Sequence, residues 1–216
     1  MGFAVARAAR DADHEVTLIA GPVALKTPRG VRRVDVVSAR DMLAAVRAEL
    51  GEPSSRAAAE QTVLVMTAAV ADWRPARCAK RKLKKDEMSD TLKLVRNPDI
   101  LKTINRQLGG PRSCATALLI RIGFAAETGA PAAEAARKCR EKGLDLVVGN
   151  DVTARGSGFG TTTNRVTFVT PDGHVQHLPL MSKLAVARRI VSFAESAVAG
   201  RPPYQPVAAL RKGTNA

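Results

Sequence analysis

The stretch TVLVMTAAVAD at residues 62–72 decides the fold class of this chain. Residues 62–70 form a continuous apolar run, which is typical of a parallel strand that helices cover on both faces. Helix-like and strand-like segments alternate on both sides of this run, and a Pro-Asp-Gly turn at 171–173 marks a β-hairpin. The sequence therefore predicts an α/β fold with a Rossmann-like, mostly parallel, doubly wound sheet and one appended β-hairpin.

The individual elements follow from periodicity, caps and turn residues. The expected strands lie at residues 14–20, 31–38, 62–70, 91–96, 116–127 and 144–151, with the hairpin at 164–180. The expected helices lie at residues 2–12, 39–50, 97–108, 131–143 and 182–199, with Ser38, Asn97 and Ser182 as N-caps. Residues 73–90 show no periodicity and are expected to be a loop.

The order of these elements differs from that of a complete doubly wound fold. The chain opens with a helix, whereas such folds normally open with a strand whose following turn binds phosphate. We therefore expect the first strand of the sheet to be missing. Residues 1–199 are assigned to one α/β domain and residues 200–216 to a disordered tail.

The overall charge points to anionic ligands. The chain has 34 Lys and Arg against 20 Asp and Glu, a net charge of +14, which favours nucleic acid, anionic lipid or phosphorylated small molecules as partners. Its three cysteines have no metal-type spacing, and we find neither a signal-peptide pattern nor an apolar run of about 20 residues. A reduced, cytoplasmic location is the simplest expectation.

The end of the central strand is the first candidate binding segment. In open α/β sheets, ligands bind outside the carboxyl ends of the strands. Ala68, Ala69 and Ala71 would let a ligand approach the backbone, and Asp72 could accept hydrogen bonds from a ribose or a base. The alternative is that the small residues only permit close helix packing and that Asp72 is an ordinary turn residue.

A basic run follows this strand end. It comprises Arg74, Arg77, Lys80, Arg81, Lys82, Lys84 and Lys85. A movable basic loop beside a sheet edge suits a polyphosphate, but a solvated charge run or a nonspecific nucleic-acid patch are the alternatives. One Trp and one Tyr offer little for stacking on bases, which weakens the nucleic-acid interpretation.

Three later segments are weaker candidates. Residues 97–100 (Asn-Pro-Asp-Ile) begin a helix whose backbone N–H groups could meet a ligand. Phe124 in GFAAET could stack on a base or fill the core. Lys138 and Lys142 share one helical face, either solvated or directed at phosphate. The histidines, cysteines and the Gly-rich segment 156–160 match no metal or dinucleotide pattern.

The order and spacing of these segments resemble one family. TAAVAD, then K-x-K-K ten residues after the Asp, NPDIL, GFAAET, K-x-x-x-K, DLVVGND and the closing hairpin and helix are similar to phosphopantothenoylcysteine synthetase. That family is the phosphopantothenate–cysteine ligase of coenzyme A biosynthesis. The resemblance runs from residue 1 to about residue 199. In many bacteria this domain forms the C-terminal half of a protein whose N-terminal half is a flavin-dependent decarboxylase, here a candidate partner.

The resemblance implies a two-step ligation in the cytoplasm by a homodimer that uses CTP and Mg²⁺. The carboxylate of 4′-phosphopantothenate attacks the α-phosphate of CTP to give an acyl-cytidylate, and the amine of cysteine then displaces the nucleotide. Lys82, in a flexible flap, is the implied catalytic residue. The implied nucleotide-binding residues are Ala68, Ala69, Asp72, Lys82, Pro98, Asp99, Ile100, Leu101, Phe124, Lys138 and Lys142.

The resemblance also has a gap at its beginning. Family members begin with a strand, a Gly-rich turn and an N-x-S-S-G-K-M-G segment that supplies an Asn and an Arg to the acyl-phosphate site. This sequence begins at the Met-Gly of that segment. We therefore expect either a gene start farther upstream or a truncated remnant, with the nucleotide site largely kept and ligase activity low. A basic nucleic-acid-associated protein and a non-catalytic subunit completed by another chain stay open as alternatives.

Overall fold

The computed structural model describes residues 1–51, 61–79, 81–82, 84, 91–107, 119–127, 131–151, 156–158 and 160–201. The helices in these ranges are α1 (Gly2–Asp11), α2 (Ala39–Leu50), α3 (Ile100–Gln107), α4 (Pro131–Lys142) and α5 (Lys183–Val198). The first strands are β1 (Thr17–Ala20), β2 (Arg32–Asp35), β3 (Thr62–Met66), β4 (Trp73–Pro75) and β5 (Leu94–Arg96). The later strands are β6 (Leu119–Glu127), β7 (Leu146–Asp151), β8 (Thr163–Asn164), β9 (Val166–Val169), β10 (Val175–His177) and β11 (Met181–Ser182).

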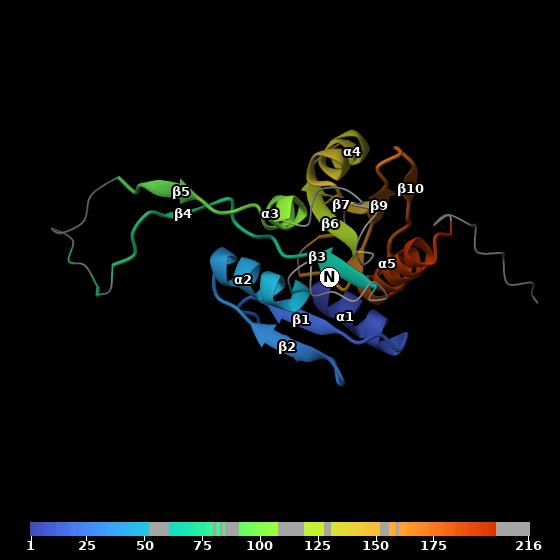
Figure 1. The fold of residues 1–216 in the computed structure, drawn as a ribbon, viewed down its shortest axis with the longest axis horizontal. Helices are drawn as coiled ribbons and strands as arrows, with labels where there is room; N and C mark the ends of the chain where they lie inside the picture. Colours follow the sequence, from blue (N-terminus) through green and yellow to red (C-terminus); the bar gives the residue numbers. More distant parts are fainter. Residues whose placement is uncertain are drawn as a thin grey trace, which may run out of the picture.

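A five-stranded sheet in the order β10-β9-β7-β6-β3 forms the centre of the molecule (Figure 1). Strands β3, β6 and β7 are parallel, with Met66 opposite Gly123 and Phe124 opposite Val148. Strands β9 and β10 continue the sheet as an antiparallel hairpin. The α/β fold class with a mostly parallel sheet and an appended hairpin is therefore confirmed.

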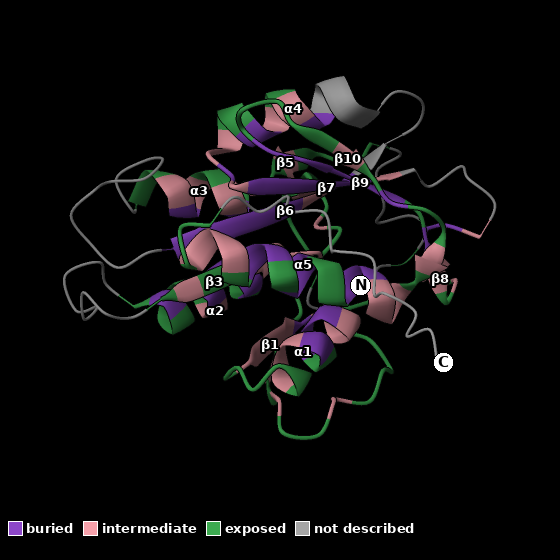
Figure 2. Ribbon diagram, turned by 90° about the vertical axis from the view of Figure 1, so that its right-hand side faces the viewer, coloured by how far each residue is buried: buried purple, intermediate pink, exposed green. Residues whose placement is uncertain are grey.

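Helices cover both faces of this sheet. On one face, α1 and α5 pack together over the alternating residues Ile120 and Ile122 of β6. On the other face, α2 and α3 enclose Leu119, while α4 packs against Ala125 and Val147. Figure 2 shows the buried residues concentrated along β6 and β7 between these layers. This sandwich explains why the strand sequences are apolar without alternation.

The parallel sheet is interrupted next to β3. Strand β1 pairs only with β2, and β3 is the edge of the five-stranded sheet, so no ladder joins β1 to β3 in the described residues. Both pieces nevertheless share helix layers, since α1 and α2 each contact β1. Val63 of β3 is 39% exposed whereas Ile120 of β6 is fully buried. This interruption agrees with the expected absence of one strand, which would leave backbone groups and apolar side chains of the neighbouring strand uncovered.

Several element boundaries differ from the prediction. Strand β3 ends at Met66 rather than at residue 70, and residues 73–75 form β4 where a loop was expected. Helix α3 begins at Ile100 instead of residue 98, so Asn97 is not its cap. The Asp99 carboxylate accepts a hydrogen bond from the Lys102 N–H at 3.0 Å and takes that role. Strand β4 forms because residues 94–96 pair with it, and Asn97 bonds to Ala71 and Arg74 instead of capping α3.

The remaining caps and turns are as predicted. Ser38 caps α2 and Ser182 caps α5. The structure adds that Asp41 completes a reciprocal capping box with Ser38 and that Gly143, with φ +59°, follows α4. No helix in the described ranges is both long and apolar enough to span a membrane. The predicted tail lies outside the described residues from position 202 onward.

Candidate functional site

The carboxyl ends of β3, β6 and β7 lie at one edge of the sheet because the three strands are parallel. After β3 ends at Met66, the predicted binding residues Ala68 and Ala69 are both exposed. Thr67 lies against the first turn of α1, since its Oγ1 is 2.8 Å from where a Cβ on Gly2 would sit. The segment therefore has the accessible backbone that the nucleotide prediction requires, and it lies beside the start of α1.

Hydrogen bonds from Asn97 join residues 71–72 to the start of α3. Its backbone N–H donates to the Asp72 carbonyl and its Nδ2 to the Ala71 carbonyl, both at 2.8 Å. Its Oδ1 accepts from Arg74 at 3.0 Å. The exposed Asp72 carboxylate makes no hydrogen bond or ion pair with the described residues. Asp72 is thus held through its backbone while its carboxylate is available to a ligand.

Asp99 and Lys142 are paired with each other. The Lys142 Nζ lies 2.9 Å from the Asp99 carboxylate and ties the end of α4 to the start of α3. Burial raises the pKa of Asp99, but hydrogen bonds from the Lys102 N–H and from Lys142 outweigh burial and hold that pKa below its ordinary value. Lys138 lies half-buried one turn before Lys142 on the same helix face. A nucleotide phosphate would have to compete with Asp99 for Lys142.

The other predicted residues are divided between the surface and the core. Pro98 lines an open cavity, but the Ile100 side chain is buried under α2 and Leu101 packs toward α4. Ile100 and Leu101 could therefore contribute only backbone groups to a ligand. Phe124 packs against the α1–α5 cluster, on the opposite face of the sheet from α4, so its ring is not gathered with Lys138 and Lys142.

Lys82 is the predicted catalytic residue. It is exposed, makes no hydrogen bond or ion pair with the described residues, and lies in the connection between β4 and β5. These two strands form an arm that extends away from the body of the molecule (Figure 1). The predicted role of Lys82 therefore requires this arm to move or to reach a ligand that projects outward.

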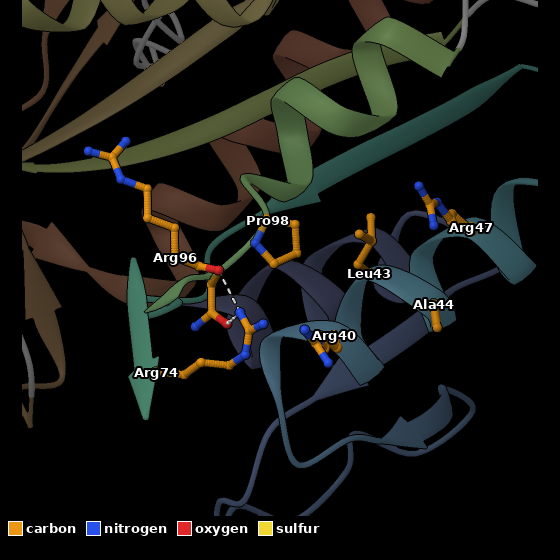
Figure 3. A pocket seen from close by; sticks show the side chains of 8 residues that line it. Arg40, Leu43, Ala44, Arg47, Arg74, Arg96 and Pro98 are labelled. Atoms are coloured by element: carbon orange, nitrogen blue, oxygen red, sulfur yellow. Dashed lines mark hydrogen bonds between the residues drawn. The ribbon is translucent and has the colours of Figure 1, made fainter. Parts of the chain in front are cut away.

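A cavity of about 510 Å³ lies beside Asn97, between α2 and the base of this arm. Its lining residues are Arg40, Leu43, Ala44, Arg47, Arg74, Arg96, Asn97 and Pro98. Figure 3 shows Arg40 and Arg74 projecting toward the same part of the cavity, with Arg47 farther along α2. The sequence analysis did not select Arg40 or Arg47; their spacing of seven residues, which places both on one side of a helix, was the signal available.

The described residues provide no preformed metal cage. They contain no group of three or more His, Cys, Asp or Glu side chains able to hold a metal ion. These residues therefore fit Mg²⁺ only as an ion that keeps several of its waters and is held mainly by substrate phosphates, with one or two carboxylates from the protein.

A doubly wound α/β domain with small, acidic and basic residues at the carboxyl ends of parallel strands belongs to the class that binds ligands in that crevice. A family model described as "DNA/pantothenate metabolism flavoprotein C-terminal domain" matches residues 1–197. The chain belongs to this family, which confirms the resemblance inferred from its motifs.

The relatives described here are bacterial proteins of coenzyme A biosynthesis. The Coenzyme A biosynthesis bifunctional protein CoaBC of Bacillus subtilis (strain 168) is 40% identical over 215 residues, which cover 99% of this chain and 46% of that protein. The protein of the same name from Vibrio vulnificus (strain YJ016) is 39% identical over 193 residues, 88% of this chain and 44% of the relative. The chain thus spans less than half the length of these relatives.

Solved structures agree with the fold. The crystal structure of the C-terminal domain of Coenzyme A biosynthesis bifunctional protein CoaBC has a TM-score of 0.66 and 38% identity, over 92% of this chain and 84% of that one. The DNA/pantothenate metabolism flavoprotein from Streptococcus pneumoniae has a TM-score of 0.67, over 90% of this chain and 86% of that one. Its identity is 18%, so it supports the fold alone.

Proposed function

We propose that this domain is a phosphopantothenate–cysteine ligase of coenzyme A biosynthesis. The single observation that carries the proposal is the family match over residues 1–197, which includes the whole carboxyl edge of the sheet. The relatives named as bifunctional coenzyme A biosynthesis proteins support the same pathway.

The proposed chemistry has two balanced steps. A carboxylate oxygen of 4′-phosphopantothenate attacks the α-phosphorus of CTP, the bond to the β-phosphate breaks, and pyrophosphate leaves. The amine of cysteine then attacks the acyl carbon, CMP leaves with the bonding electrons, and the amine loses a proton. A closed, water-poor site would protect the mixed anhydride from hydrolysis between the two steps.

The chain's residues have separable parts in this scheme. Ala68, Ala69 and the Asp72 carboxylate offer an accessible backbone and an acceptor for the ribose or base. Lys138 and Lys142 offer positive charge for phosphates at the end of α4. Lys82, carried by the β4–β5 arm, would close over the acyl-cytidylate and stabilise charge that develops during its turnover.

The cofactor and assembly complete the proposal. Mg²⁺ would arrive with the triphosphate and neutralise charge on its oxygens. We further propose a cytoplasmic homodimer, with a flavin-dependent phosphopantothenoylcysteine decarboxylase as the partner or neighbouring domain that consumes the product.

The test combines binding and turnover. Isothermal titration with CTP and Mg²⁺ should show binding, and incubation with 4′-phosphopantothenate and cysteine should release pyrophosphate and give the amide product by mass spectrometry. Lys82→Ala should lower kcat by about 100-fold, the scale for losing one donor that stabilises charge in the transition state. Lys26→Ala, which removes another exposed lysine, should leave kcat unchanged. A folded protein that gives no heat with CTP, or that shifts DNA in a salt-sensitive way without competition from CTP, would count against the ligase proposal.

A further inference from the structure

The cavity beside Asn97 is lined by positive charge without a neighbouring carboxylate in its lining. Four of its eight lining residues are arginines, from α2 (Arg40 and Arg47), β4 (Arg74) and β5 (Arg96), and none of the eight is acidic. Asp41, the carboxylate next to Arg40 in the chain, is engaged in the capping box with Ser38. Like charges that share a concave surface without a carboxylate favour an anion between them.

The guanidinium groups differ in how many donors are already used. Arg74 donates through Nη1 to the Arg96 carbonyl and to Asn97 Oδ1, which orients the group and leaves its other nitrogens available among the described residues. Arg40 makes no hydrogen bond or ion pair within the described part of the chain. A guanidinium has five N–H donors in a planar fork that matches the oxygens of a phosphate group.

The other two arginines occupy different positions. The Arg96 side chain turns away from Arg40 in Figure 3, and its guanidinium stacks 4.9 Å from the Trp73 ring centroid. Arg47 donates to Gln107 at 2.9 Å and lies seven residues after Arg40, roughly 10 Å along the helix. Arg40 and Arg74 are therefore the two arginines directed at one part of the cavity, and Arg47 lies farther along it.

We propose that Arg40 and Arg74 form a phosphate-binding subsite that includes none of Asp72, Lys138 and Lys142, although Pro98 of the predicted nucleotide set lines the same cavity. The ligand class is a small molecule that bears a phosphate group, because the cavity of about 510 Å³ is concave and fits a small ligand. Inorganic phosphate and a phosphate monoester share this chemistry. Assigning the monoester to 4′-phosphopantothenate, whose phosphate is remote from its reacting carboxylate, rests on the proposed function; the subsite itself does not.

The test compares two arginine variants of matched chemistry. Arg40→Gln removes charge from the subsite, and Arg188→Gln removes it from an exposed position on α5 that lines neither cavity described by the structure. Isothermal titration at fixed ionic strength with inorganic phosphate, 4′-phosphopantothenate, pantothenate and CTP separates the ligand sources. Arg40→Gln should raise the Kd for the phosphate-bearing acid about tenfold to 100-fold, the scale for a charge-assisted hydrogen bond. Arg188→Gln should not.

The outcomes are distinguishable from those of the ligase proposal. Unchanged CTP binding with weakened phosphopantothenate binding supports the subsite, and weakening for inorganic phosphate alone assigns it to the free anion. Equal affinities of wild type and Arg40→Gln for every phosphate ligand overturn the inference while CTP binding stands. Equal weakening by both arginine variants also overturns it, because net charge would then explain the effect.

Discussion

Replacing Gly123 by alanine tests the packing that sets the position of α3 against the sheet. Gly123 lies in β6 opposite Met66 of β3 and Val147 of β7. A Cβ at this position would be 2.7 Å from Leu144 Cδ1 and 3.3 Å from Leu101 Cδ1. Both distances are shorter than an ordinary carbon–carbon contact of about 3.5–4.0 Å. The added methyl group must therefore displace Leu144, which is only 4% exposed, and press on Leu101 near the start of α3.

The expected loss follows from this overpacking. Inserting a methyl group into a tightly packed interior costs about 1–3 kcal/mol, and the alanine preference for a strand interior offsets only part of it. For a domain of this size, a loss of 1 kcal/mol lowers Tm by about 2–4 °C. Urea unfolding followed by circular dichroism gives the free energy of unfolding. Gly21→Ala is the control, because nothing lies within 4 Å of its new Cβ, and it should be neutral or slightly stabilising.

A second substitution identifies the obstructing side chain. Leu144→Ala alone should cost about 2–5 kcal/mol through the cavity that it leaves. Combined with Gly123→Ala, it removes the atom that the new methyl group meets, so the double variant should be no less stable than Leu144→Ala alone. If the losses of the two single variants simply add, Leu144 is not the obstruction and the packing argument fails.

Other predictions concern caps, charge and thiols. Ser38→Ala should lower the free energy of unfolding by about 0.5–2 kcal/mol through loss of the capping box, measured by urea unfolding; no change would contradict a structural role for the cap. Asp99→Asn keeps an oxygen that can cap α3 and removes only the charge beside Lys142, so it should cost about 0.2–1 kcal/mol at pH 7. Because the pKa of Asp99 is lowered in the folded state, this stability is present above about pH 4 and is lost as the pH falls through the lowered pKa, so a pH-independent difference would refute the pairing with Lys142. Iodoacetamide should modify the exposed Cys78 in the native protein and spare Cys139, which is fully buried and whose pKa burial raises to about 12; peptide mass spectrometry showing equal modification would contradict this.

The sequence by itself determined the features that depend on local chemistry. The apolar run of β3, the Ser38 cap of α2, the glycine after α4 and the Pro-Asp-Gly hairpin are each readable from a few neighbouring residues. The candidate binding segment at Ala68, Ala69 and Asp72 was also readable, because ligands meet doubly wound sheets at the carboxyl ends of their strands.

Only the tertiary structure decided the features that depend on partners distant in the chain. Residues 73–75 become a strand because residues 94–96 pair with them, and β3 becomes an edge because no strand lies between it and β1 in the described residues. The Asp99–Lys142 pair and the cavity shared by Arg40 and Arg74 likewise join separate elements. Periodicity and capping report what a segment prefers locally, whereas these contacts depend on where folding places a second segment, and a local pattern carries no record of that position.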